Sequence, residues 1–319
     1  MEVDQATRLR SLVEELKTHD GAIELSAGVC RDGENRTARN ALARTWRGLN
    51  RVGAPLRTVA ITSGKGGVGK TNLTVNLAIA LSHLGRRVLI LDGDLGLANV
   101  DVLLDIHPRH NLQDVVEGRR TIEEIVLEGP DGVRVVPGGS GLYDMANLDD
   151  HRAQYLVESA AALDGIADTL LIDTAAGISA NVVNLVQAAG EAVVVASPEP
   201  TSITDAYGLI KVIASSSRQP QFRLVINMAG SVAEADEVAR RVVLAARQFL
   251  GLEIDYCGMI PTDANVVKAV RRQTPFLVAY PKSAATLGVT ALARRLVGQG
   301  VRQGDGGGID EFFRRVMGR

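Results

Sequence analysis

The stretch that decides the fold is Gly64-Lys65-Gly66-Gly67-Val68-Gly69-Lys70-Thr71. An apolar run at residues 58–62 precedes it and a longer, largely apolar segment at residues 72–81 follows it, so the stretch connects a predicted strand to a predicted helix. Glycines in such a loop allow successive backbone N–H groups to turn inward around a phosphate group. The sequence therefore predicts a phosphate-binding loop whose ligand is a nucleoside triphosphate.

Three side chains of this loop have different expected roles. Lys70 should neutralise the β- and γ-phosphate oxygens, and the Thr71 hydroxyl should bind Mg²⁺. Lys65 precedes the glycines, so its side chain leaves the loop in a direction from which its own phosphate is hard to reach. It is either a solvated side chain or one directed at another site. Contacts with the nucleotide are also expected from the remaining loop residues, Gly64, Gly66, Gly67, Val68 and Gly69.

Length, charge and composition narrow the class of protein. The chain has 319 residues, which is enough for one large α/β domain or two small ones. Its net charge of −2 gives no global attraction to nucleic acid or to a membrane. The two cysteines, Cys30 and Cys257, do not have the spacing of metal ligands. No apolar run approaches the roughly 18 residues of a membrane-spanning helix, and there is no hydrophobic signal core, so a cytoplasmic protein is expected.

Three zones are expected along the chain. Residues 1–57 are polar and arginine-rich and predict a partly ordered extension. Residues 58–297 alternate short apolar runs with helical patterns, which predicts a doubly wound, mostly parallel sheet with helices on both faces. Residues 298–319 predict a glycine-rich tether and an amphipathic helix. The predicted strands are residues 59–62, 88–92, 133–136, 170–173, 192–196, 224–227 and 256–260.

Acidic residues end two of these strands, and ligands bind at the carboxyl ends of strands in open α/β sheets. Asp92 and Asp94, separated by one residue, can support Mg²⁺ and orient a water for attack on the γ-phosphorus. Asp173 should hold Mg²⁺, and the backbone of Gly177 should sense the γ-phosphate. A single Asp at a strand end can equally cap a helix, but three such acids together indicate a site.

Recognition of the base is predicted at the ends of two later strands. The amide of Asn227 can satisfy the donor and acceptor of the adenine N6/N7 edge. Pro261 and Asp263 follow the next strand, where they can flank the base. All three residues are equally compatible with turn chemistry. Adenine is favoured over guanine because the chain lacks an Asn-Lys-x-Asp string.

The last residues of the chain carry a single apolar stripe. Its helical positions i, i+3, i+4, i+7 and i+8 are occupied by Ile309, Phe312, Phe313, Val316 and Met317. Arg314, Arg315 and Arg319 add basic charge. A helix this short cannot span a bilayer but can lie in its interface. It can also pack on its own domain or on a protein partner.

Four strings together resemble the MinD/ParA family of ATPases, which has a deviant Walker A loop. They are residues 64–71, 92–101, 173–177 and 199–207. The resemblance covers essentially all of residues 58–317. It extends to the flagellar-number regulators FlhG and FleN, because Asp4-Gln5-Ala6-Thr7-Arg8-Leu9-Arg10 is similar to the segment that FlhG presents to the GTPase FlhF. Gly93 stands where relatives often carry alanine or phenylalanine, which puts no role in doubt.

The resemblance implies an ATP-dependent switch. ATP favours a homodimer in which Lys65 crosses to the partner's nucleotide, and Asp94 orients the water whose attack ends the dimeric state. For the C-terminal stripe, the resemblance implies docking on an anionic membrane surface, so the protein is expected at the inner face of the cell membrane. Gln5 is expected to act on an FlhF-like GTPase, and a flagellar transcription regulator is a further expected partner.

Other functions within the superfamily remain open. A MinD-type ATPase of cell-division site selection is compatible with the same strings. A ParA-like ATPase that positions DNA or cargo would need a concentrated basic patch, which the charge balance does not offer, so direct binding to nucleic acid is not expected. A structural adaptor that binds ATP without hydrolysing it is also compatible with the sequence.

Overall fold

The computed structural model describes residues 56–94, 99–139, 148–216, 218–299 and 307–318. The chain divides into two units, Met1–Val52 and Gly53–Arg319, and the described residues belong to the second unit. The expectations for the N-terminal zone, including the role of Gln5, therefore lie outside the described residues.

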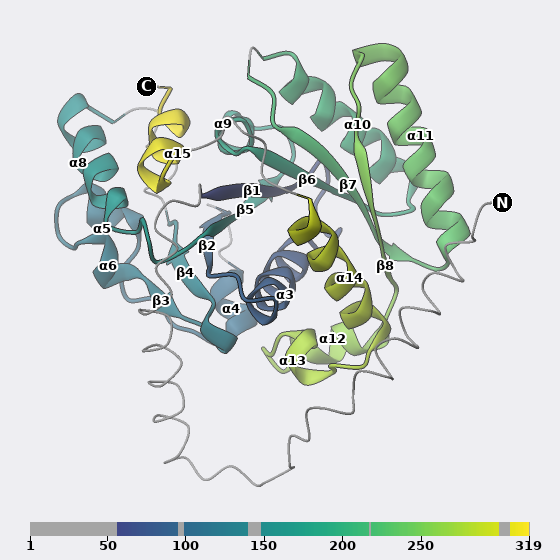
Figure 1. Cartoon of the computed structure of the whole chain (residues 1–319), viewed down its shortest axis with the longest axis horizontal. Coiled ribbons are helices and arrows are strands. Elements are labelled where there is room, and N and C mark those ends of the chain that lie inside the picture. Colours follow the sequence, from purple (N-terminus) through teal and green to yellow (C-terminus); the bar gives the residue numbers. More distant parts are fainter. Residues whose placement is uncertain (1–55, 95–98, 140–147, 217, 300–306, 319) are drawn as a thin grey trace, which may run out of the picture. The chain divides into compact units, whose positions relative to one another are not determined.

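The second unit is built on an eight-stranded sheet with the order β3-β4-β2-β5-β1-β6-β7-β8 (Figure 1). Neighbouring strands are parallel except for β3, which pairs antiparallel with β4. The strand β1 lies between β5 and β6, near the middle of the sheet. The strands are β1 (Arg57–Ser63), β2 (Val88–Gly93), β3 (Leu127–Glu128), β4 (Arg134–Pro137), β5 (Thr169–Ala176), β6 (Glu191–Ala196), β7 (Gln221–Ala229) and β8 (Asp255–Pro261).

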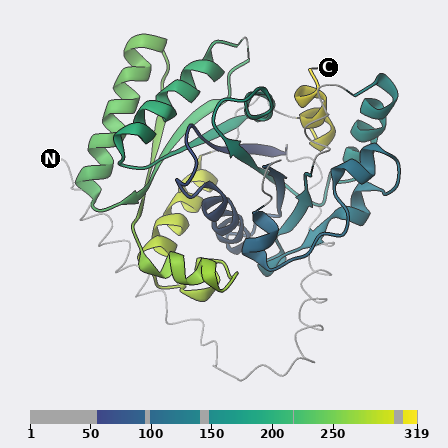
Figure 2. The same ribbon diagram turned by 180° about the vertical axis from the view of Figure 1, so that it is seen from behind.

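Helices cover both faces of this sheet (Figures 1 and 2). One face packs against α5 (Leu112–Val116), α6 (Ile122–Ile125), α8 (Asp150–Ala161), α9 (Ala180–Ala188), α10 (Pro200–Ala214), α11 (Val232–Leu250) and α15 (Ile309–Val316). The other face packs against α3 (Lys70–His83), α4 (Val100–Leu104), α12 (Ala264–Arg271), α13 (Phe276–Ala279) and α14 (Ala284–Gly298). A 3₁₀ turn, η2 (Pro130–Gly132), precedes β4.

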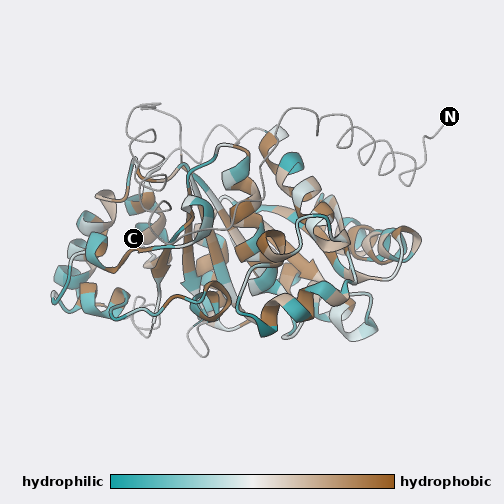
Figure 3. Cartoon of the chain, turned by 90° about the horizontal axis from the view of Figure 1, so that it is seen from below, coloured by the Kyte–Doolittle hydropathy of each residue, from teal (hydrophilic) through white to brown (hydrophobic). Residues whose placement is uncertain are grey.

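Successive residues of a central strand enter different cores. In β5, Leu170 and Ile172 belong to the core on one face, and Leu171 belongs to the core on the other. Burial on both faces explains why the strands read as continuous apolar runs, and the strands are largely apolar in Figure 3. The doubly wound fold and all seven strands predicted from the sequence are confirmed. The strand β3 was missed because its two residues are too few to carry a pattern.

A buried charge network joins the amino ends of four strands. Both carboxylate oxygens of Glu191 accept hydrogen bonds, one from Arg57 Nε at 2.6 Å and the other from Arg223 Nε at 2.5 Å. Arg223 also pairs with Asp255 at 2.9 Å. Arg57 donates a further hydrogen bond to the carbonyl oxygen of Leu296 in α14. The network therefore joins β1, β6, β7, β8 and α14 at the amino ends of the strands, whereas the phosphate-binding loop lies at their carboxyl ends.

The C-terminal helix α15 packs on α8 and α9 of its own unit. The side chains of Ile309, Phe312, Phe313 and Val316 are at most 6% exposed, and the two rings meet edge to face with centroids 5.5 Å apart. The backbone N–H of Ile309 donates to Asp164 Oδ1 at 2.8 Å, which caps the first turn of the helix. The apolar stripe thus faces its own domain here, one of the arrangements that the sequence left open. Among the described helices, none is long and apolar enough to cross a membrane.

Candidate active site

The predicted phosphate-binding loop connects β1 to α3. Gly69, the residue before α3, has a φ of 86°, which is left-handed backbone that favours glycine. A Cβ at this position would also lie 2.5 Å from Nδ2 of Asn227. Gly64 approaches α10 so closely that a Cβ would overlap the backbone carbonyl of Asp205. The loop is therefore held between β7 on one side and α10 on the other.

Lys70 is the first residue of α3 and is only 8% exposed. Burial lowers the pKa of its ammonium group, and the negative charges of Asp173 and Asp94 oppose this shift. The structure thus places a buried cation beside two carboxylates at the N-terminus of a helix, where an anion is favoured. This arrangement suits a phosphate group placed on the loop.

Asp173 lies in β5 with its carboxylate beneath the loop. Its Oδ1 atom accepts a hydrogen bond from Thr74 Oγ1 at 2.8 Å, and the nearby Thr71 hydroxyl also favours the ionised carboxylate. Burial raises the pKa of Asp173 to about 6. The Oδ2 atom is buried and has no hydrogen-bond partner among the described residues. A buried carboxylate oxygen without a partner, beside a hydroxyl, fits a hard cation such as Mg²⁺.

The set of donors also limits which kind of metal site is possible. Within the described ranges, no group of three or more His, Cys, Asp and Glu side chains could hold a metal ion. Mg²⁺ usually keeps several waters and binds through one or two protein ligands together with substrate phosphates. Thr71 and Asp173 fit that pattern, and a cage built only from protein ligands is not found in this part of the chain.

Asp92 lies in β2, directly opposite Asp173 in the register of β2 and β5. Its two oxygens accept hydrogen bonds from the backbone N–H groups of Asp94 (3.2 Å) and Val100 (3.4 Å). Burial and the neighbouring charge of Asp173 raise the pKa of Asp92 to about 7. Asp92 therefore holds the backbone on either side of residues 95–98, and its support of Mg²⁺ stays a prediction.

Asp94 and Gly177 lie at the carboxyl ends of β2 and β5. The charge of Asp94 acts on Lys70, which places the carboxylate near the loop. Gly177 has a φ of 94°, and its N–H donates to the carbonyl oxygen of Ser63 at 2.9 Å. The amide expected to sense a γ-phosphate is thus bonded to the end of β1. The roles in water orientation and phosphate sensing stay predictions.

Lys65 points away from its own phosphate-binding loop. Its Nζ atom lies 2.5 Å from Glu199 Oε2 and 3.1 Å from Thr201 Oγ1, at the start of α10. Glu199 and Thr201 lie in the string of residues 199–207 that resembles the family, but the sequence alone predicted no role for either side chain. Their only sequence signal was that string, because a contact between residues 134 positions apart leaves no local pattern.

The residues expected at the base are engaged in contacts within the protein. The Nδ2 atom of Asn227 donates to the carbonyl oxygen of Val68 at 2.7 Å, which joins β7 to the phosphate-binding loop. Asp263 accepts from the N–H groups of Asn265 (2.8 Å) and Ala285 (3.1 Å), so it caps α12 and contacts α14. These contacts lower the pKa of Asp263, although its partial burial opposes the shift. Contact with a base stays a prediction for Asn227 and Asp263, as it does for Pro261 at the end of β8.

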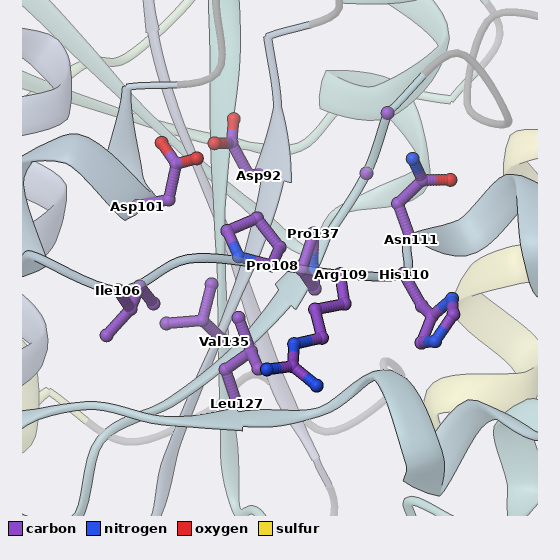
Figure 4. Close-up of a pocket in the computed structure, with 12 residues that line it drawn as sticks. Asp92, Asp101, Ile106, Pro108, Arg109, His110, Asn111, Leu127, Val135 and Pro137 are labelled. Atoms are coloured by element: carbon purple, nitrogen blue, oxygen red, sulfur yellow. The ribbon is translucent and has the colours of Figure 1, made fainter.

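A pocket of about 130 Å³ lies beside Asp92 at the carboxyl ends of β2 and β4 (Figure 4). Its wall carries the carboxylates of Asp92 and Asp101 as well as the basic side chains of Arg109 and His110. None of these residues except Asp92 was singled out from the sequence. The pocket shares Asp92 with the candidate active site and is otherwise separate from the phosphate-binding loop.

Comparison with known proteins places the chain in a family. A family model described as the CobQ/CobB/MinD/ParA nucleotide binding domain matches residues 59–276. The Antiactivator FleN of Pseudomonas aeruginosa is 43% identical over 82% of this chain and 94% of that protein. The Flagellum site-determining protein YlxH of Helicobacter pylori is 31% identical over 81% and 89%, respectively. The septum site-determining protein MinD of Bacillus subtilis is 31% identical over 76% and 90%.

Solved structures agree with this placement. MinD from Pyrococcus horikoshii, complexed with Mg-ADP, superposes with a TM-score of 0.61 at 26% identity, covering 76% of this chain and 96% of that one. The MinC:MinD complex of Aquifex aeolicus gives 0.60 at 28% identity, covering 77% and 97%. The chain belongs to the MinD/ParA family of P-loop ATPases and is an ATP hydrolase. The family resemblance read from the sequence is thereby confirmed.

Proposed function

We propose that this ATPase is a dimerising switch that controls the number or placement of flagella. Two flagellar relatives support the proposal, the antiactivator FleN and the flagellum site-determining protein YlxH. The observation that carries it is the 43% identity with FleN, because it extends over 94% of that protein. The other supporting observations concern how the described residues could bind ATP, dimerise and reach a membrane.

ATP with Mg²⁺ is the proposed substrate complex. The loop and Lys70 bind the β- and γ-phosphates, and Thr71 and Asp173 are the residues that would hold the cation. Mg²⁺ bound there would neutralise charge that develops on the transferred phosphoryl group. Asp94 accepts a hydrogen bond from the attacking water and so orients it toward the γ-phosphorus. Mg-ADP in the Pyrococcus horikoshii MinD structure supports the choice of cation.

The position of Lys65 supports an ATP-dependent dimer. The Lys65 and Glu199 side chains are 37% and 64% exposed, so solvent screens their ion pair and it contributes at most about 1 kcal/mol. A triphosphate on a second protomer carries more negative charge and can displace Glu199. Lys65 therefore rests on α10 in the monomer and moves to the partner's nucleotide in the ATP dimer.

The C-terminal helix is the proposed membrane anchor. Its stripe is Ile309, Phe312, Phe313, Val316 and Met317, and the first four of these are buried against the domain. Membrane docking therefore requires release of α15, which lies on α9, the helix that follows Gly177. We propose that ATP binding at this switch region loosens α15 and frees it for the inner face of the cell membrane. Two helices in one dimer then act together, which can raise affinity by about 10²-fold or more.

Two protein partners complete the proposal. The N-terminal segment, through Gln5, would stimulate an FlhF-like GTPase. The antiactivator role of FleN supports a flagellar transcription regulator as the second partner. No direct contact with nucleic acid is needed for either interaction.

A deletion strain and a purified variant with impaired hydrolysis test the proposed function. A strain that lacks the gene should have an altered number of flagella, while the placement of its septa stays normal.

In vitro, Asp94→Ala should still bind ATP and dimerise, but its turnover should fall about 10²-fold or more because the water loses its orienting group. The exposed Glu123→Ala should behave as wild type. Normal flagellation in the deletion strain would refute the flagellar role, and full turnover in Asp94→Ala would refute the role of that carboxylate.

Cell-division site selection is the second candidate function. It is favoured by the 31% identity with Bacillus subtilis MinD over 90% of that protein. Misplaced septa with normal flagella in the deletion strain would support this alternative instead.

A further inference from the structure

A second threonine of α3 contacts the same carboxylate as Thr71. Thr74 lies three residues after Thr71, so the two hydroxyls are on one side of the helix. Thr74 Oγ1 lies 2.8 Å from Asp173 Oδ1 and 3.1 Å from the carbonyl oxygen of Lys70. A threonine hydroxyl has one hydrogen, and the bond to the carboxylate is both shorter and charge-assisted. Thr74 therefore donates its hydrogen to Asp173.

The two threonines differ in their burial and in the other partners that their hydroxyl groups can reach. Thr74 is fully buried, whereas Thr71 is half-buried at the loop. On the proposed function, the hydroxyl of Thr71 turns to Mg²⁺, so it does not hold the carboxylate of Asp173 when the cation is bound. Among the described residues, the carbonyl oxygen of Lys70 is the one other acceptor near the hydroxyl of Thr74. Its bond to Asp173 is therefore the one that persists.

A persistent donor at one oxygen determines where the other oxygen points. The terminal torsion of an aspartate is broad, so the carboxylate plane is not fixed by rotamer preference alone. The bond from Thr74 holds Oδ1 of Asp173 against α3. The second oxygen, Oδ2, is buried and lacks a hydrogen-bond partner among the described residues. It is thus the atom left to face the cation or a water bound to it.

We propose that Thr74 is a positioning residue for the metal site, which orients the Asp173 carboxylate so that Oδ2 is presented to Mg²⁺. The inference rests on the proposed role of Asp173 in holding Mg²⁺. It assigns a function to a residue that contacts the loop only through the carbonyl oxygen of Lys70 among the described residues and does not bind the cation itself. Removal of such an outer hydrogen-bond partner typically weakens metal binding by about 10–100-fold.

Three substitutions separate the hydrogen bond from packing. Thr74→Val keeps the shape of the side chain and removes the donor, while Thr74→Ser keeps the donor and removes a methyl group. Thr62→Val is the matched control, because Thr62 is also fully buried beside the loop but its hydroxyl has no partner among the described residues. Circular dichroism and thermal unfolding establish that each variant folds. If Thr74→Val does not fold, Thr74→Ala compared with Thr74→Ser isolates the same hydrogen bond.

Binding of a fluorescent ADP analogue to the full-length protein is the measurement. It is made in EDTA and across a Mg²⁺ titration, and Mn²⁺ binding in the presence of ADP, followed by electron paramagnetic resonance, gives a readout independent of turnover. Thr74→Val should raise the half-saturating Mg²⁺ concentration about tenfold or more and leave affinity in EDTA within about twofold of wild type. Thr74→Ser and Thr62→Val should match wild type in both conditions.

The outcomes distinguish failure of this inference from failure of the proposed metal site. If wild type depends on Mg²⁺ and Thr74→Val has the same half-saturation, Thr74 does not position Asp173. A loss that appears equally in EDTA, or equally in Thr74→Ser, would assign the effect to packing and also overturn the inference. If wild-type binding shows no dependence on Mg²⁺ at all, the proposed metal site is itself wrong.

Discussion

At the scale of single residues, the site contains two carboxylates that burial has made weaker acids. Asp92 and Asp173 have pKa values of about 7 and about 6, above their ordinary value of 3.8. Between pH 4 and pH 7 the native state therefore holds protons that the unfolded chain has lost, so stability should fall as the pH rises through this window. A bound cation reverses the effect because it favours the ionised carboxylates.

Asp92→Asn should flatten this pH dependence. Each unit of pKa shift corresponds to about 1.4 kcal/mol, so Asp92 should cost wild type roughly 2–4 kcal/mol of unfolding free energy between pH 4 and pH 8. Carboxylates with a lowered pKa, such as Asp263, lose their contribution only below about pH 4 and do not disturb the window. Urea unfolding in EDTA from pH 5 to pH 8 measures both slopes. Parallel slopes for wild type and variant would contradict the prediction.

Lys65 and Glu199 should have opposite effects on dimerisation. Lys65→Ala should bind ATP with little change but fail to dimerise, since the side chain that crosses to the partner is gone. Glu199→Gln should dimerise at a lower ATP concentration, because Lys65 is no longer held on α10 by an opposite charge. Size-exclusion chromatography with light scattering in ATP measures both. Normal dimerisation of Lys65→Ala in ATP would show that Lys65 is not needed to form the dimer.

The sequence predicted the roles of residues that lie close together in short strings. It predicted far less about contacts between residues that are distant in the sequence. The loop at residues 64–71 and the acids at strand ends follow from short strings whose spacing reflects backbone geometry. The contacts of Lys65 with Glu199 and of Asn227 with Val68 bridge more than a hundred residues and could not be read from periodicity. Thr74 was missed for a related reason, since its helical position looks like that of any other core residue.

At the scale of elements, α15 shows how one amphipathic pattern can suit two environments. Each large apolar side chain gains about 1.5–3 kcal/mol on burial, whether it is buried in a protein or in a bilayer. The sequence therefore predicted the stripe correctly but could not decide which surface covers it. The contact of Asp164 with Ile309 is what the structure adds, because it is specific to the docked state.

Asp164→Ala should favour release of α15. The first turn of the helix loses the acceptor of the Ile309 N–H, which should cost the docked state about 1 kcal/mol and raise binding to anionic vesicles about fivefold in ADP. Asp164→Asn keeps an acceptor oxygen and should resemble wild type. Phe313→Glu should abolish vesicle binding, and salt should weaken whatever binding remains. Co-sedimentation in ADP and in ATP makes the comparison, and equal pelleting of all variants would contradict it.

At the scale of the whole molecule, the charge network around Glu191 holds together the amino ends of the strands, which are the ends farthest from the phosphate-binding loop. Arg223 is 1% exposed and Glu191 is 6% exposed, so neither charge can be solvated if its partner is lost. Removing one member of such a network costs far more than the intact network contributes, because it leaves an uncompensated buried charge.

Glu191→Gln should therefore destabilise the protein by about 3–5 kcal/mol at neutral pH. The matched control is Glu237→Gln on α11, which breaks an exposed pair with Arg241 and should change the unfolding free energy by less than about 1 kcal/mol. Chemical denaturation of both variants provides the measurement. A similar decrease in the free energy of unfolding of both variants would show that burial of the network does not make its loss more costly.

This network also joins the start of β1 to the end of α14. Arg57, at the start of β1, is bonded to Leu296, while Arg223 is bonded to Gln299, which directly follows α14. The start of β1 and the end of α14 are therefore held together by one set of buried charges, so a force that pulls these two points apart must first break the network.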